Sequence, residues 1–142
     1  MKSILRLFIL LLACAALGAP RTALAQMADV TTTLSGAATL NQGQTTGTYT
    51  AAFTNNGPNT AAGVTQKVTL AAGASLRAAQ LTTIQNAYPG TAYTPATRVL
   101  YFTGAPVTLA SAATNTFHFA FIAPTTTTGI VALISAVTTT TN

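Results

Sequence analysis

Apolar and polar residues alternate along several short stretches of the chain. In residues 48–54 every second position is Tyr, Ala or Phe, and the positions between them are Thr or Ala. In residues 116–121 phenylalanine fills every second position, which leaves His118 on the opposite face. A period of two is the side-chain repeat of a β-strand. Both stretches therefore predict strands that bury one face and show the other to solvent.

Residues that favour turns separate these stretches. The clearest case is Asn55-Asn56-Gly57-Pro58, because Asn and Gly accept left-handed backbone angles and Pro cannot continue strand pairing. We interpret Asn55, Asn56, Gly57 and Pro58 as a structural turn at the end of a core strand. A ligand-binding loop is the alternative interpretation of these four residues, and we favour the structural one.

The runs between turns predict about seven strands. Threonine accounts for 29 of the residues in 26–142 and suits a pleated surface, whereas the helix formers Glu and Lys are nearly absent. Seven short strands in one domain are typical of an antiparallel sandwich. The predicted fold class is therefore all-β, an immunoglobulin-like antiparallel β-sandwich made by residues 26–142. The expected strands lie near residues 28–36, 45–55, 62–70, 76–86, 96–103, 114–122 and 129–139.

The first 25 residues have the pattern of a signal peptide. Lys2 and Arg6 precede an apolar run that ends at Leu17, and Ala23-Leu24-Ala25 has the small-x-small form of a cleavage site. The run is too short for a permanent anchor, and no second run of about 20 apolar residues follows it. We expect cleavage after Ala25 and an exported product without a transmembrane helix. The cell surface, the medium and the periplasm all remain open as destinations.

Cys14 leaves a second interpretation of this leader open. Leu11-Leu12-Ala13-Cys14 has the outline of a bacterial lipobox, in which the cysteine carries lipid. Arg6 lies close upstream and Leu12 is bulky for its position, so we favour removal of Cys14 with the leader. The exported chain then has no thiol and forms no disulfide.

Charged groups are scarce, and their scarcity excludes several kinds of function. The 142 residues include six Lys or Arg, one acidic residue and one His. Residues 26–142 keep three cations (Lys67, Arg77 and Arg98) against Asp29, a net charge of +2. Three scattered cations cannot neutralise a run of phosphates, so nucleic acid is not an expected partner. Carboxylate-pair hydrolysis and metal sites need side chains that are missing, and we expect no cofactor.

The few chemically active side chains do not form a convincing catalytic set. A Ser/His/Asp arrangement requires Asp29, near the start of the exported chain, to meet His118 and a serine. A Ser/Lys dyad of Ser75 and Lys67 lacks an oxyanion loop beside it. We therefore predict that the protein is not an enzyme. The serines available to the first arrangement are Ser35, Ser75, Ser111 and Ser135.

The region from Gly43 to Ser75 carries a motif as well as a strand pattern. It resembles the family called Domain of Unknown Function eleven, and the opening Ala28-Asp29-Val30 matches that family too. The resemblance implies an immunoglobulin-like sandwich, found in exported and surface proteins of bacteria and archaea, and it implies no catalytic residues. The matching positions are Tyr49-Thr50-Ala51-Ala52-Phe53-Thr54-Asn55-Asn56-Gly57-Pro58, Ala61, Val64, Leu70 and Ala72-Gly73.

The last predicted strand is apolar on both faces. Residues 129–137 have no charge and no proline, and Thr runs flank them on each side. Such a strand is either covered within its own domain or meets another molecule at a sheet edge. The first exported strand, Ala28 to Ser35, is a second candidate for contacts because terminal strands exchange easily between subunits. The residues predicted for self-association are Ile130, Val131, Leu133, Ile134 and Val137.

These features predict a secreted or cell-surface protein with a structural or adhesive role. Its expected partners are further copies of the chain, as a fibre or matrix subunit, or other envelope and surface proteins. The alternative is a monomeric module that binds a glycan or a protein through its loops. That alternative requires exposed Tyr88 and Tyr93, beside Pro89 and Pro95, to stack on a sugar ring.

Overall fold

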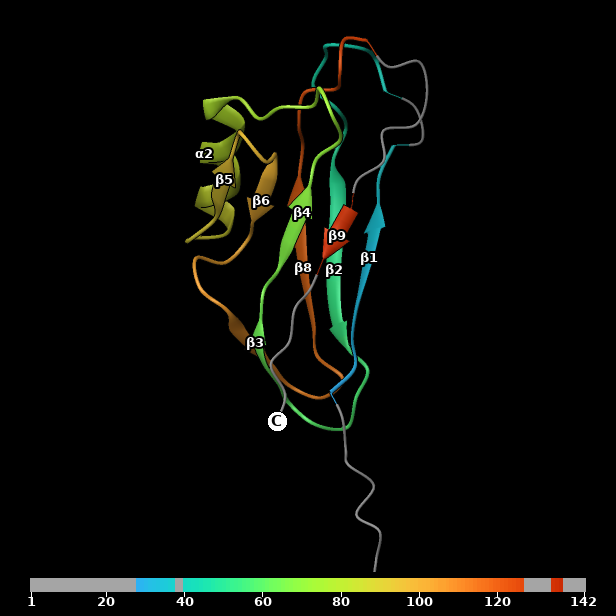
Figure 1. Ribbon diagram of the computed structural model, residues 1–142, viewed down its shortest axis with the longest axis vertical. Helices are drawn as coiled ribbons and strands as arrows, with labels where there is room; N and C mark the ends of the chain where they lie inside the picture. The colour runs from blue at the N-terminus through green and yellow to red at the C-terminus, as the bar shows by residue number, and fades with distance from the viewer. Residues whose placement is uncertain (1–27, 38–39, 127–133, 137–142) are drawn as a thin grey trace, which may run out of the picture.

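The protein is mostly β, with antiparallel sheets of three, two and four strands and one short helix (Figure 1). The structure is a computed structural model that describes residues 28–37, 40–126 and 134–136. The strands are β1 (Val30–Ser35), β2 (Tyr49–Asn55), β3 (Ala61–Val64), β4 (Lys67–Thr69), β5 (Ala92–Thr94), β6 (Val99–Tyr101), β7 (Val107–Leu109), β8 (Thr114–Phe119) and β9 (Ile134–Ala136), and the helix is α2 (Ala78–Ala87).

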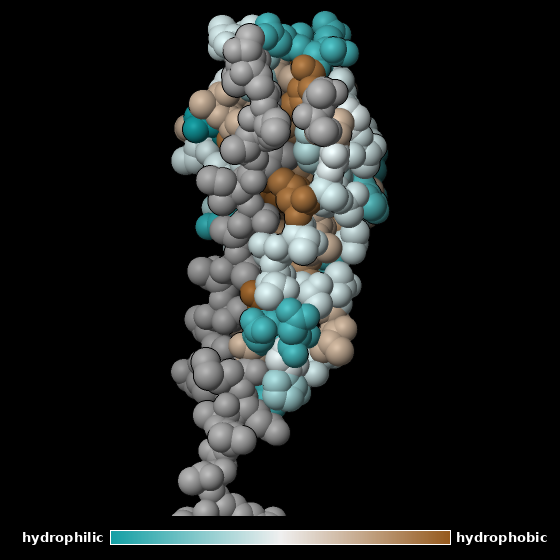
Figure 2. All heavy atoms as spheres, turned by 90° about the vertical axis from the view of Figure 1, so that its right-hand side faces the viewer, coloured by the Kyte–Doolittle hydropathy of each residue, from teal (hydrophilic) through white to brown (hydrophobic). Residues whose placement is uncertain are grey.

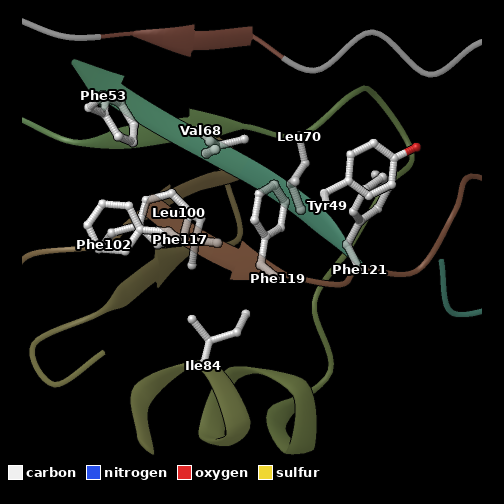
Figure 3. Packing of buried hydrophobic residues seen from close by; sticks show 12 residues of the cluster. Tyr49, Phe53, Val68, Leu70, Ile84, Leu100, Phe102, Phe117, Phe119 and Phe121 are labelled. Carbon is white, nitrogen blue, oxygen red and sulfur yellow. The ribbon is translucent and has the colours of Figure 1, made fainter. Parts of the chain in front are cut away.

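Two of the sheets face each other across the core. The three-stranded sheet has the order β1-β2-β8, and the four-stranded sheet has the order β5-β6-β4-β9. Their inward side chains belong to one hydrophobic cluster, which includes Phe53 of β2, Val68 of β4 and Leu100 of β6 (Figure 3). The helix α2 covers one side of this core next to β5 and contributes Ile84 (Figures 1 and 3).

Aromatic packing holds the two layers together. The rings of Phe102 and Phe117 are stacked, with centroids 4.4 Å apart and planes 8° apart. Phe53 packs edge-on against both rings and is fully buried. Stacked and edge-on pairs add about 0.5–1.5 kcal/mol each to the free energy of burial. The prediction that the phenylalanines of residues 116–121 share a core face is confirmed, since Phe119 and Phe121 are buried as well.

The alternating stretches form strands as predicted. In β2 the odd positions Tyr49, Ala51 and Phe53 are buried, and the positions between them are half-buried. β1 and β8 lie within the ranges expected at 28–36 and 114–122. Strands β2 and β8 bury the apolar face that the sequence pattern marks, and the inward face of the outer strand β1 is half-buried.

The strand predicted at residues 76–86 is wrong, because residues 78–87 form the helix α2. The segment contains Ala, Gln and Leu, which favour a helix, and its apolar residues Leu81, Ile84 and Tyr88 are three and four positions apart. The backbone N–H of Arg77 donates to the Gln80 side chain at 2.9 Å, which fixes the first turn. The strand was predicted from the threonine content of the whole chain, and that prediction gave too little weight to this local helical spacing.

Other boundaries also differ from the expected ones. The single strand expected at 62–70 is two strands, β3 and β4, which belong to different sheets. The break falls at Gln66, whose backbone carbonyl accepts a hydrogen bond from the Phe102 N–H at 3.0 Å. The short strands β5 and β7 were not predicted, because three residues are too few to show a period of two.

Candidate functional site

The outward side chains of the three-stranded sheet form a regular array of mostly small, hydroxyl-bearing groups. We call this array the threonine face. The outer strands β1 and β8 expose their contributing residues, and those of the central strand β2 are half-buried. The strand register aligns them in three rows: Thr31, Thr54 and Thr114; Thr33, Ala52 and Thr116; and Ser35, Thr50 and His118.

The register also sets the spacing of the array. Neighbouring strands lie about 4.8 Å apart and alternate residues along a strand lie about 6.7 Å apart, so the nine positions span roughly 10 by 13 Å. Ala52 occupies the centre, because β2 is the middle strand and the middle row contains Thr33 and Thr116. The smallest side chain of the array is therefore surrounded by larger, mostly β-branched ones.

Several polar groups of the threonine face already bond to one another. Thr54 Oγ1 lies 2.9 Å from Thr114 Oγ1. Thr50 Oγ1 lies 3.0 Å from His118 Nδ1. The Asn56 side-chain amide donates to Thr31 Oγ1 at 2.9 Å. Burying a polar group costs little when it keeps a hydrogen bond, so these groups can lose water at low cost.

None of the nine positions of the threonine face is Lys, Arg, Asp or Glu. The exposed Asp29 lies just beyond the face, two residues before Thr31, whereas Lys67 is in β4, Arg98 precedes β6 and Arg77 precedes α2. In the space-filling view from the β1 side, most of the described surface is pale and teal is confined to patches (Figure 2). The face has hydroxyls for hydrogen bonding but no fixed charge with which to bind an ion.

Asn55, the first residue of the predicted turn, is fully buried and makes hydrogen bonds in several directions. Its Oδ1 accepts from the backbone N–H groups of Asp29 and Gly57, both at 3.1 Å. Its Nδ2 donates to three backbone carbonyls, those of Asn59 at 2.7 Å, Leu109 at 3.0 Å and Ala110 at 3.2 Å. This side chain therefore connects the start of β1, the turn after β2 and the end of β7.

The other turn residues surround this connection. Gly57 is buried, and its carbonyl accepts from the Ser111 hydroxyl at 2.8 Å, while Asn56 and Pro58 are exposed. The four residues thus join two loops through hydrogen bonds. We missed the burial of Asn55 at the sequence level, although its place at an inward position of the alternating stretch was a usable signal.

Most of the predicted self-association strand lies outside the described residues, namely Ile130, Val131, Leu133 and Val137. Ile134 begins β9 and is paired with Thr69 of β4. Strand β9 ends the order of its sheet, as β1 does in the three-stranded sheet. Both strands named as contact candidates are thus terminal in their sheets among the described residues.

The catalytic candidates are not brought together as a triad requires. His118 is exposed and opposite Thr50, whereas Asp29 precedes Val30, which is opposite Asn55. Five residues of β2 separate these levels, a distance of about 17 Å. Lys67 and Ser75 share no hydrogen bond in the described part of the chain.

Tyr88 and Tyr93 are less exposed than a sugar-stacking platform requires. Both are half-buried and pack against the core cluster. The Tyr88 ring lies edge-on to Phe117 at 5.0 Å, and its hydroxyl accepts the His118 backbone N–H at 2.9 Å. Burial raises the pKa of the Tyr93 hydroxyl, against smaller lowering effects from Arg98 and a backbone hydrogen bond at Leu76. The monomeric glycan-binding alternative requires both rings to be exposed, and in this structure both are half-buried against the core cluster.

Within the described ranges, no group of His, Cys, Asp and Glu is arranged to hold a metal ion, and no helix has the length and apolar character to span a membrane. Cys14 and the whole predicted leader lie outside the described residues. Comparison of the chain with family models, curated proteins and solved structures found no match. The arrangement of the described residues is therefore the basis for a functional proposal.

Proposed function

We propose that the protein is an exported structural or adhesive domain of the bacterial or archaeal cell surface that works by contact and associates with copies of itself. The observation that carries this proposal is the threonine face, a patterned surface with hydroxyls and no charge. Interface cores are depleted of charged residues, which matches this composition. The pattern of the first 25 residues supports export, with residues 26–142 as the functional domain.

We also propose that the fold is an immunoglobulin-like sandwich. Two facing antiparallel sheets with a shared aromatic core support an immunoglobulin-like sandwich. The motif at Gly43 to Ser75 supports membership in Domain of Unknown Function eleven. The helix α2 is not part of the predicted set of strands. It lies beside the core, and the two sheets still face each other (Figure 1).

Strand edges provide one route for association. Strands β1 and β9 each end the order of their sheets. An edge strand can pair with a strand of another copy through its backbone. A glycan-binding role has weaker support, because Tyr88 and Tyr93 are packed against the core and the threonine face has no Tyr, Trp or Phe side chain.

The test is to produce the complete chain, leader included, in a bacterium that exports it. Mass spectrometry of the exported product should show cleavage after Ala25, and a chain that stays in the cytoplasm with Met1 to Ala25 attached would contradict export. Light scattering over a range of concentrations should show a mass that rises above that of one chain. A product that remains a monomer at millimolar concentration would overturn the self-association part.

A further inference from the structure

We infer that the outward face of the four-stranded sheet binds an acidic glycan, whose sugar ring stacks on Tyr101 and whose carboxylate pairs with Lys67. The inference goes beyond the proposed function, because it names a ligand class and uses the sheet opposite the threonine face. It does not depend on self-association. The site is also separate from Tyr88 and Tyr93, the two residues that the monomeric glycan-binding alternative requires.

Tyr101 differs from the other three tyrosines of the chain in its surroundings. The other three pack in or against the core cluster, whereas Tyr101 belongs to neither hydrophobic cluster. It follows the buried Leu100 in β6, so the alternation of the strand places its half-buried ring on the outward face. Among the described residues its hydroxyl makes no hydrogen bond. The ring contributes little to the core and is available to a ligand.

A cation lies directly beside this ring. The strand register places Lys67 of β4 opposite Tyr101, and side chains in such positions have Cβ atoms about 4.5–5.5 Å apart. In the part of the chain that the structure describes, the Lys67 side chain forms no ion pair and no hydrogen bond. The single acidic residue, Asp29, precedes β1 in the other sheet. The ammonium group of Lys67 can therefore pair with an anionic group of a ligand.

The side chains around this pair are small, so they leave the ring and the ammonium group accessible. Ala92 of β5 is the other register neighbour of Tyr101 and is exposed. The C–H groups on one face of a sugar ring carry partial positive charge and suit the negative face of an aromatic ring. A uronic acid adds a carboxylate at the edge of the same sugar, where Lys67 can reach it. The adjacent row of these three strands contains Thr69, Val99 and Thr94.

The size and charge of the face favour a glycan over a protein partner. In β4, β5 and β6 the two rows span only roughly 10 by 7 Å. A standard protein interface needs roughly 800 Å² from each partner. A second copy of the same face is disfavoured as well, because it would bring one Lys67 against the other. A polymer with a carboxylate on each sugar can engage many copies, so weak single contacts add up on a cell surface.

The first test measures binding of acidic sugar trimers to the exported full-chain product by isothermal titration calorimetry. The probes are the trimers of galacturonate, mannuronate and glucuronate. The control for each probe is its methyl ester, which keeps the sugar and removes the charge. At least one trimer should bind, and its ester should bind about tenfold more weakly because a charged hydrogen bond is lost. Binding of none of the three trimers, or equal binding of acid and ester, overturns the inference.

A matched pair of variants separates this site from general charge attraction. Lys67→Gln and Arg77→Gln remove the same charge, and Arg77 is exposed at the start of α2. Only Lys67→Gln should weaken binding of the trimer, by about tenfold. Equal losses in the two variants overturn the inference.

The role of the ring is tested separately. Tyr101→Ala should weaken binding about fivefold, and Tyr101→Phe, which keeps the ring, should bind like the wild type. Circular dichroism establishes that each variant is folded, and Tyr101→Leu provides the same test if the alanine variant is not. Unchanged binding without the ring overturns the inference. Light scattering measures self-association independently, so the proposed function stands or falls on a different result.

Discussion

Replacing Asn55 with alanine should lower the free energy of unfolding by about 3–5 kcal/mol. The variant removes five hydrogen bonds made by a fully buried amide. The backbone groups that lose their partners belong to three separate segments, so the loss affects tertiary structure more than any one strand. Alanine cannot replace the amide, because it has neither donor nor acceptor.

The magnitude follows from where each bond lies. Two bonds, to the Gly57 N–H and the Leu109 carbonyl, are buried, and leaving such groups unsatisfied costs about 1–3 kcal/mol each. The other three bonds are only partly buried, so water can replace them at a cost of about 0.5 kcal/mol or less each. The expected loss is a large part of the free energy of unfolding of a typical domain, which is about 5–15 kcal/mol.

Urea unfolding followed by circular dichroism or tyrosine fluorescence measures the change, and no tryptophan complicates the signal. The control is Asn56→Ala, whose amide is exposed and bonds only to Thr31 Oγ1 among the described residues, with an expected loss below about 0.5 kcal/mol. A loss below about 1 kcal/mol for Asn55→Ala, with an unchanged urea dependence, would refute the role assigned to this residue.

Three further predictions concern the fold, each measured by urea or thermal unfolding. Phe102→Ala should lose about 3–5 kcal/mol, because it removes a buried ring that is stacked in the core; a loss under about 1.5 kcal/mol would contradict the packing. Ala112→Gly should gain up to about 1 kcal/mol because φ is +58° there, whereas Ala110→Gly should lose stability; equal effects would contradict this strain. Burial raises the pKa of the Tyr49 hydroxyl above its usual value of 10.0, so the contribution of the neutral side chain to stability is complete below pH 10 and is lost as the pH rises through the raised pKa. In the Tyr49→Phe variant the free energy of unfolding should therefore fall less steeply with pH in that window. An unchanged slope would exclude Tyr49 ionisation as a cause of the fall.

The parts of the fold that the sequence predicted are those in which local pattern and tertiary environment agree. Strand β2 alternates strictly, and each apolar residue of the alternation is buried. The helix α2 was missed because its segment has a weak amphipathic pattern and contains two threonines, Thr82 and Thr83, which bond back to helical carbonyls at 3.0 Å. A scan for i, i+3 and i+7 spacing finds Leu81, Ile84 and Tyr88 in the same segment.

The candidate site was less accessible to sequence analysis than the fold. A threonine face requires that three strands lie side by side in one register, and the pairing of β1 with β2 and of β2 with β8 joins residues 15 to 70 positions apart. Alternation within one strand identifies outward residues but not their neighbours in the next strand. The position of Ala52 at the centre could therefore be recognised only after the register was known.

The proposed function places stability and contact on opposite faces of the same strand, so an experiment can separate them. Asn55 points inward at the end of β2 and binds three loops together, whereas Ala52 points outward from its middle. Asn55→Ala should weaken the fold and leave the association of folded molecules intact, whereas Ala52→Arg should do the reverse. If both variants lose stability and association together, the face and the core form one cooperative unit and a separate contact surface is excluded. If the protein works by surface contact, Asn55→Ala should lose stability and keep association, whereas Ala52→Arg should keep stability and lose association.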